Sequence, residues 1–101
     1  MIYKVEIGKS ARSDIEKLSD FLAYNMTLEG AWRYKEAMRD EILSLSIYAD
    51  LYYTSRYVDV RRFYPKARRM LSHNKKWVYI FHVEGAVVVV DRIYPAKMIA
   101  K

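Results

Sequence analysis

Apolar and charged residues alternate at the start of the chain and then change to helical spacing. Residues 3–7 read Tyr-Lys-Val-Glu-Ile, and this alternation predicts a half-buried strand. From Ala11 to Leu22, apolar residues recur at steps of three and four, which places them on one face of a helix. We therefore expect a helix over about 11–24, with Ser10 as its N-cap. Asp14 falls in an early turn, where the helix dipole favours an acid.

A second helical pattern follows after a short break. Apolar residues between Ala31 and Ala49 again recur at steps of three and four, and Thr27 stands before them at a capping position. This pattern predicts a longer helix over about 28–48. Because the connection is so short, the two helices should form an antiparallel hairpin.

The second half of the chain is typical of strands after a long irregular segment. Periodicity fails from Asp50 to Lys66, and a loop of that length inside a compact domain is usually functional or mobile. Strand-like runs then cover 67–72, 77–83 and 86–93, with a tight turn expected at Glu84-Gly85. Residues 87–90 are all valine, which indicates a central strand.

The order of the elements defines the fold class. Strand, helix, helix, strand, strand, strand predicts an α+β fold, with a helical hairpin packed on one face of a four-stranded, mainly antiparallel sheet. At 101 residues, the chain is expected to form a single domain spanning 1–101.

Composition excludes several kinds of chemistry. The chain has no cysteine and three glycines, so it predicts no disulfide, no thiolate metal site and no glycine-rich nucleotide loop. His73 and His82 have no partner at metal-ligand spacing, and His82 is expected on the strand face away from the aromatic residues. We therefore expect no metal and no cofactor. There is no signal peptide and no apolar run long enough for a membrane span, so a cytoplasmic location is expected.

Charge is divided unequally between the halves of the chain. Residues 1–50 carry 7 basic and 9 acidic residues, whereas residues 51–101 carry 11 and 3. The net +8 of the second half favours an anionic partner: nucleic acid, an acidic protein, or both. The alternative is a solubilising surface with no specific partner.

Basic residues concentrate in the segment 56–76, which contains Asp59 as its single acid. Arginine makes bidentate contacts to phosphate, and interleaved tyrosines can stack on bases of single-stranded RNA. The alternative is that tyrosines pack on the sheet while arginines bind acidic groups of a protein. The candidate RNA-binding residues are Arg56, Arg61, Arg62, Lys66, Arg68, Lys75 and Lys76.

Arg69 is a special position within this segment. On the predicted strand it shares a face with Ala67 and Leu71, so its guanidinium points inward or at a cleft. A half-buried arginine needs an anion or a hydrogen-bonded partner. That partner is either a bound phosphate or a structural acid such as Glu6 or Asp91.

Four stretches together resemble the RelE/ParE superfamily of bacterial toxins from type II toxin–antitoxin pairs. Residues 3–15 resemble the family's opening strand and its A-x-x-D-[IL] helix start. Residues 67–71 resemble the [VI]-R-R-L strand, and residues 77–83 resemble Y-x-[IV]-x-Y-x-[VI]. Residues 90–94 are similar to the terminal [IV]-x-R-[VIL]-x-H strand. The likeness covers nearly the whole chain and includes the order of the elements.

The resemblance implies one of two activities. RelE-like members cleave mRNA, often on the ribosome, and ParE-like members poison DNA gyrase; an antitoxin silences both. Our leading hypothesis is a metal-independent endoribonuclease in which Arg69, Arg92, Tyr94 and Lys97 stabilise the scissile phosphate and move protons. The alternatives are a gyrase inhibitor and a toxin fold without activity.

The chain departs from the nuclease pattern near its end. Tyr94 stands where a terminal histidine is frequent, Pro95-Ala96-Lys97 replaces the usual G-R-R, and Asp91 adds an acid. The resemblance also implies a protein partner, an acidic and amphipathic antitoxin. We expect that antitoxin to cover the basic segment.

Overall fold

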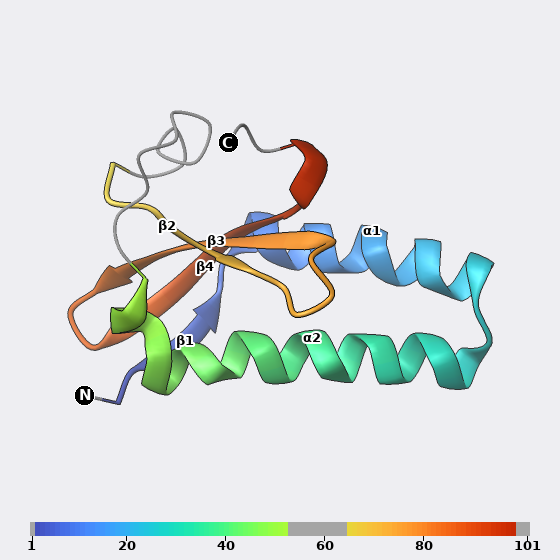
Figure 1. Cartoon of the computed structure of the whole chain (residues 1–101), viewed down its shortest axis with the longest axis horizontal. Coiled ribbons are helices and arrows are strands. Elements are labelled where there is room, and N and C mark those ends of the chain that lie inside the picture. The colour runs from blue at the N-terminus through green and yellow to red at the C-terminus, as the bar shows by residue number, and fades with distance from the viewer. Residues whose placement is uncertain (1, 53–64, 99–101) are drawn as a thin grey trace.

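The sheet in this computed structural model is built from strands that are far apart in the sequence (Figure 1). The structure describes residues 2–52 and 65–98. The strands are β1 (Lys4–Ile7), β2 (Arg68–Leu71), β3 (Trp77–Glu84) and β4 (Val87–Pro95). Their order is β1-β4-β3-β2, with β1 parallel to β4 and the other neighbours antiparallel. The predicted α+β class, the strand count and the central place of the valine-rich strand are therefore confirmed.

Two long helices lie side by side along the molecule as an antiparallel hairpin (Figure 1). They are α1 (Lys9–Asn25) and α2 (Leu28–Tyr48), and single-turn 3-10 helices η1 (Ala49–Leu51) and η2 (Ala96–Met98) follow α2 and β4. The predicted bounds of α2 are confirmed. Thr27 caps it as expected, since the Gly30 amide donates to its Oγ1 at 3.0 Å.

The predicted cap of α1 is wrong, because the helix starts earlier than Ser10. Its N-cap is Gly8, which provides no side-chain cap. The Gly8 amide still donates to the Val90 carbonyl at 2.8 Å, so the chain passes from sheet to helix within one residue. A Cβ at position 8 would lie 3.0 Å from that carbonyl oxygen, which explains why glycine suits this sharp exit.

The main core lies between the helical hairpin and one face of the sheet. The β3 residues Trp77, Tyr79, Phe81 and Val83 all pack into it, as their alternation predicts. Leu45 from α2 is fully buried against them. Burial of this apolar surface is what holds the hairpin to the sheet.

The β3–β4 hairpin differs in two details from the sequence prediction. Its turn is formed by Gly85 and Ala86, one residue later than expected, and Gly85 has a left-handed φ of 58°. Ile80 pairs with Arg92 whereas Phe81 pairs with Val90, so Asp91 is an extra residue in β4. This β-bulge reverses the alternation of the strand beyond position 91.

Candidate functional site

The face of the sheet away from the helices, here called the distal face, carries several of the predicted functional residues. A second buried apolar cluster lies there, formed by Ala67, Val78 and Ile80, with Tyr94 packed against it. The register pairs Arg69 with Ile80 and Ile80 with Arg92. The two arginines therefore lie on the distal face in register with each other, one on each side of Ile80. Both are half-buried.

Arg92 is held by an acid from the first helix. Its Nε donates to Asp14 Oδ2 at 2.9 Å and its Nη2 to Asp14 Oδ1 at 3.1 Å. The backbone amide of Ile93 also donates to Asp14 Oδ2, at 2.9 Å. The Asp14 hydrogen bond raises the pKa of Arg92 above its ordinary value. The Arg92 guanidinium lies 4.4 Å from the ring centre of Tyr94, a cation–π contact that joins two predicted catalytic residues.

Asp14 contacts two residues of the candidate site, Arg92 and Ile93, a contact that its sequence position did not predict. It was assigned to the helix dipole, but no acid lies in the first turn of α1, and Asp14 instead binds the end of β4. The available signal was its spacing: Asp14 stands three residues after Ala11 and four before Leu18, both buried, so it lies on the apolar face. An acid on such a face requires a donor partner.

His82 lies on the distal face between two carboxylates. Its Nδ1 is 2.6 Å from Asp91 Oδ2 and its Nε2 is 2.9 Å from Glu84 Oε1. Burial alone would lower the pKa of His82, but the hydrogen bonds to Asp91 and Glu84 outweigh burial and raise it. When the ring is protonated, both nitrogens donate, and His82 then ties β3 to the bulge of β4.

The remaining predicted cations separate into groups. Lys75 and Lys76 lie in the β2–β3 turn, close to Lys97 in η2, and all three are exposed. Arg68 faces the helical side instead, where its Nη1 donates to the Ala49 carbonyl at 3.0 Å. Lys66 is exposed before β2. The other candidates, Arg56, Arg61 and Arg62, lie outside the described residues.

The two structural acids proposed for Arg69 make other contacts. Glu6 Oε1 lies 3.5 Å from Lys4 Nζ, and Asp91 Oδ2 contacts His82 Nδ1. Arg69 itself is half-buried in β2 on the distal face, as its neighbours in the sequence indicated. Its role in phosphate binding stays a prediction.

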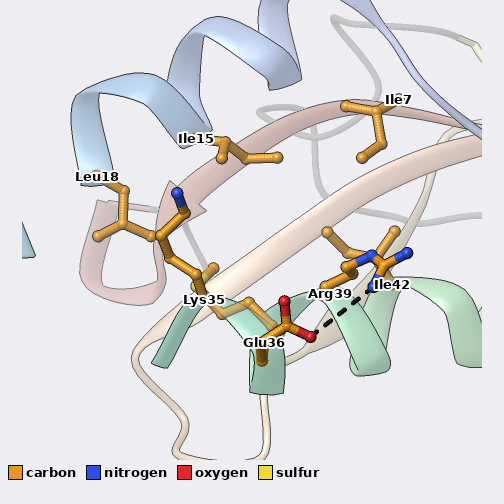
Figure 2. Close-up of a pocket in the computed structure, with 8 residues that line it drawn as sticks. Ile7, Ile15, Leu18, Lys35, Glu36, Arg39 and Ile42 are labelled. Carbon is orange, nitrogen blue, oxygen red and sulfur yellow. Dashed lines mark ion pairs between the residues drawn. The ribbon is translucent and has the colours of Figure 1, made fainter. Parts of the chain in front are cut away.

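A separate apolar cavity of about 250 Å³ lies between α1, α2 and β1 (Figure 2). Ile7, Ile15 and Ile42 point into it, whereas the charged side chains come from α2. Glu36 and Arg39 pair with each other at 3.8 Å. Lys35 also lines the cavity, but among its described lining residues Glu36 is the single acid and Arg39 partly neutralises it, so the cavity is a poor candidate for catalysis.

Two features of the described residues bear on other function classes. No group of three or more histidine, cysteine, aspartate or glutamate residues in this part of the chain could hold a metal ion. Within the same ranges, 2–52 and 65–98, neither long helix has the length and apolar character needed to cross a membrane.

Comparisons with known proteins match this chain to a family and to a solved structure over nearly its whole length. Residues 5–100 match a family described as "ParE toxin of type II toxin-antitoxin system, parDE". A chain in the solved structure "Chromosomal ParDE TA system from P. aeruginosa" has a TM-score of 0.76 and 16% identity, covering 93% of this chain and 96% of that one. No curated protein matches at a significant level. The family match extends over nearly all of the sequence, from β1 to beyond η2, and the chain therefore belongs to the ParE toxin family of type II toxin–antitoxin systems.

Proposed function

We propose that this toxin arrests growth by binding DNA gyrase and does not cleave RNA itself. The observation that carries the proposal is the engagement of Arg92 by Asp14, in a chain whose family match is to ParE over residues 5–100. Gyrase poisoning is the activity that the ParE branch of the superfamily implies. The protein then needs a complementary surface and no acid–base pair of its own.

RNA cleavage by the 2′-OH requires cations that grip the scissile phosphate and a group that moves protons. Arg92 already gives two donors to Asp14, so a bidentate phosphate contact would have to displace a half-buried carboxylate. His82 has a carboxylate at each ring nitrogen. Arg92 is thus already bound to α1, and His82 to carboxylates of β3 and β4.

The endoribonuclease remains the second candidate, acting on mRNA alone or on the ribosome. This candidate is favoured because Arg69 and Arg92 both pair with Ile80 on the distal face and Tyr94 lies beside Arg92. In that mechanism Arg69 and Lys97 bind phosphate, and Tyr94 moves a proton.

The two activities separate cleanly in cells. The toxin is induced alone in bacteria, and both mRNA 5′ ends and chromosomal breaks are mapped within minutes of induction. We expect intact transcripts, a DNA-damage response and breaks at gyrase sites. Cleaved transcripts without DNA breaks would support the endoribonuclease and refute the gyrase proposal.

A further inference from the structure

A groove at one end of the sheet, here called the end groove, joins the helical hairpin to the last strand. It has a volume of about 730 Å³. Phe21, Leu22 and Met26 supply apolar surface from α1 and its C-cap, and Lys75, Lys76 and Lys97 supply the charge. Phe21 is 60% exposed, although it is a large aromatic side chain beside a cavity. Such exposed apolar surface with a charged border is typical of a protein-binding site.

The wall that presents two of these lysines is fixed by hydrogen bonds. Trp77 Nε1 donates to the Tyr34 hydroxyl at 2.6 Å, and Asn74 Nδ2 donates to the same oxygen at 3.0 Å. The Lys76 amide donates to Asn74 Oδ1 at 3.0 Å, which closes the β2–β3 turn. A preformed wall lowers the entropy that a partner loses on binding.

Backbone strain is located in the same wall. Lys75 has a φ of 64°, a left-handed conformation that is unfavourable for lysine. Its amide donates to the Ser72 carbonyl at 2.9 Å, and the Ala96 amide donates to the Lys76 carbonyl at 2.9 Å. These bonds hold the turn against the end of β4, so that Lys75 and Lys76 stand next to Lys97. Strain maintained in this way is commonly found at binding sites.

Charge distinguishes the end groove from the cavity in Figure 2. That cavity contains its own acid–base pair, Glu36 and Arg39. In the part of the chain that the structure describes, no acid lines the end groove and none of its three lysines has an ion-pair partner. The groove therefore presents three uncompensated positive charges around an apolar surface.

We propose that the end groove is the docking site of an acidic, amphipathic segment of the antitoxin. An apolar side chain of that segment covers Phe21 and Met26, and its carboxylates reach Lys75, Lys76 and Lys97. A protein segment fits better than nucleic acid, because leucine and methionine line the groove and because lysine lacks the planar fork that arginine offers phosphate. This proposal concerns the antitoxin and holds whether the target is gyrase or RNA.

The test measures binding of the purified toxin to its cognate antitoxin, by biolayer interferometry at low and high salt. The groove variant is K75E/K76E/K97E. Its matched control is K9E/R12E/K17E, which changes charge equally on exposed α1 residues outside the groove. A second pair compares Phe21→Ser with Tyr24→Ser, since Tyr24 is 91% exposed but does not line the groove.

We expect K75E/K76E/K97E to weaken binding by about 100-fold at low salt, with a smaller effect at 1 M salt, because screening removes most of the repulsion. Phe21→Ser should weaken binding by about 10-fold at both salts. Each control should stay within about threefold of wild type.

Two outcomes would overturn the proposal: wild-type antitoxin affinity in the groove variants, or equal losses of affinity in the controls. Thermal melts check folding. If the triple variant does not fold, Phe21→Ser and Lys97→Glu alone decide, because both side chains are exposed.

Discussion

Asp14→Ala should destabilise the toxin more than any other substitution of an acid on α1. Its carboxylate is 10% exposed and accepts three hydrogen bonds, two from Arg92 and one from the Ile93 amide. Removing it leaves a half-buried guanidinium without its carboxylate and a backbone amide without an acceptor. Both losses act at the place where α1 meets the end of β4.

The size of the effect follows from these contacts. Leaving a buried charge uncompensated costs about 3–5 kcal/mol, but the Arg92 side chain is 27% exposed and water can replace part of the contact. The orphaned amide adds about 1 kcal/mol or more. We therefore expect a loss of about 2–4 kcal/mol, which for a domain of this size lowers the Tm by roughly 10–25 °C.

Urea unfolding followed by circular dichroism measures this directly. Asp20→Ala is the matched control, since Asp20 is an exposed acid on the same helix, and it should change stability by less than about 0.5 kcal/mol. The double variant D14A/R92A should lose less than the sum of the two single variants. A loss below about 1 kcal/mol for Asp14→Ala, or strict additivity, would refute the reasoning.

Three further predictions concern other parts of the fold. The pKa of His82 is raised, so its contribution to stability is complete below the ordinary value of 6.5 and is lost as pH rises through the higher folded value. Urea midpoints of the wild type should therefore fall as pH rises above 6.5, with less change in His82→Gln, in which Asp91 and Glu84 lose their titrating partner. Gly85→Ala should cost about 1 kcal/mol and Gly85→Asn less, measured by thermal melts, because asparagine tolerates the left-handed φ of 58° better. Arg69→Ala should abolish growth arrest while the Tm stays within about 5 °C of wild type if its role is to bind the target; a collapse in Tm would show a structural role instead.

The local pattern of apolar and polar residues was sufficient to predict the bounds of α2 and the inward face of β3. The bounds of α2 follow from Thr27 and from apolar residues on one face. The inward face of β3 follows from strict alternation along a strand with neighbours on both sides. Neither prediction required knowledge of contacts elsewhere in the chain.

Features set by long-range contacts could not be read in this way. Gly8 starts α1 because its amide pairs with Val90, a residue far along the sequence. Asp91 interrupts the alternation of β4, so Arg92 shares the distal face with Ile80 while Ile93 enters the core. The bulge places Arg92 next to Asp14, and the local sequence pattern does not reveal it.

The sequence named Arg69, Arg92 and Tyr94 as candidates but did not place them relative to one another. In the structure they share the distal face, on strands β2 and β4 that lie on either side of β3. The end groove was not expected, because its lining comes from both helices, a turn and the last strand. Only folding brings those segments together.

The most direct test of the central claim uses purified gyrase, supercoiled plasmid and this toxin. The account predicts that linear, gyrase-bound DNA accumulates as toxin is added, that none forms without gyrase, and that added antitoxin prevents it. Plasmid that stays intact at saturating toxin, together with cleavage of a purified mRNA by the same preparation, would contradict the account.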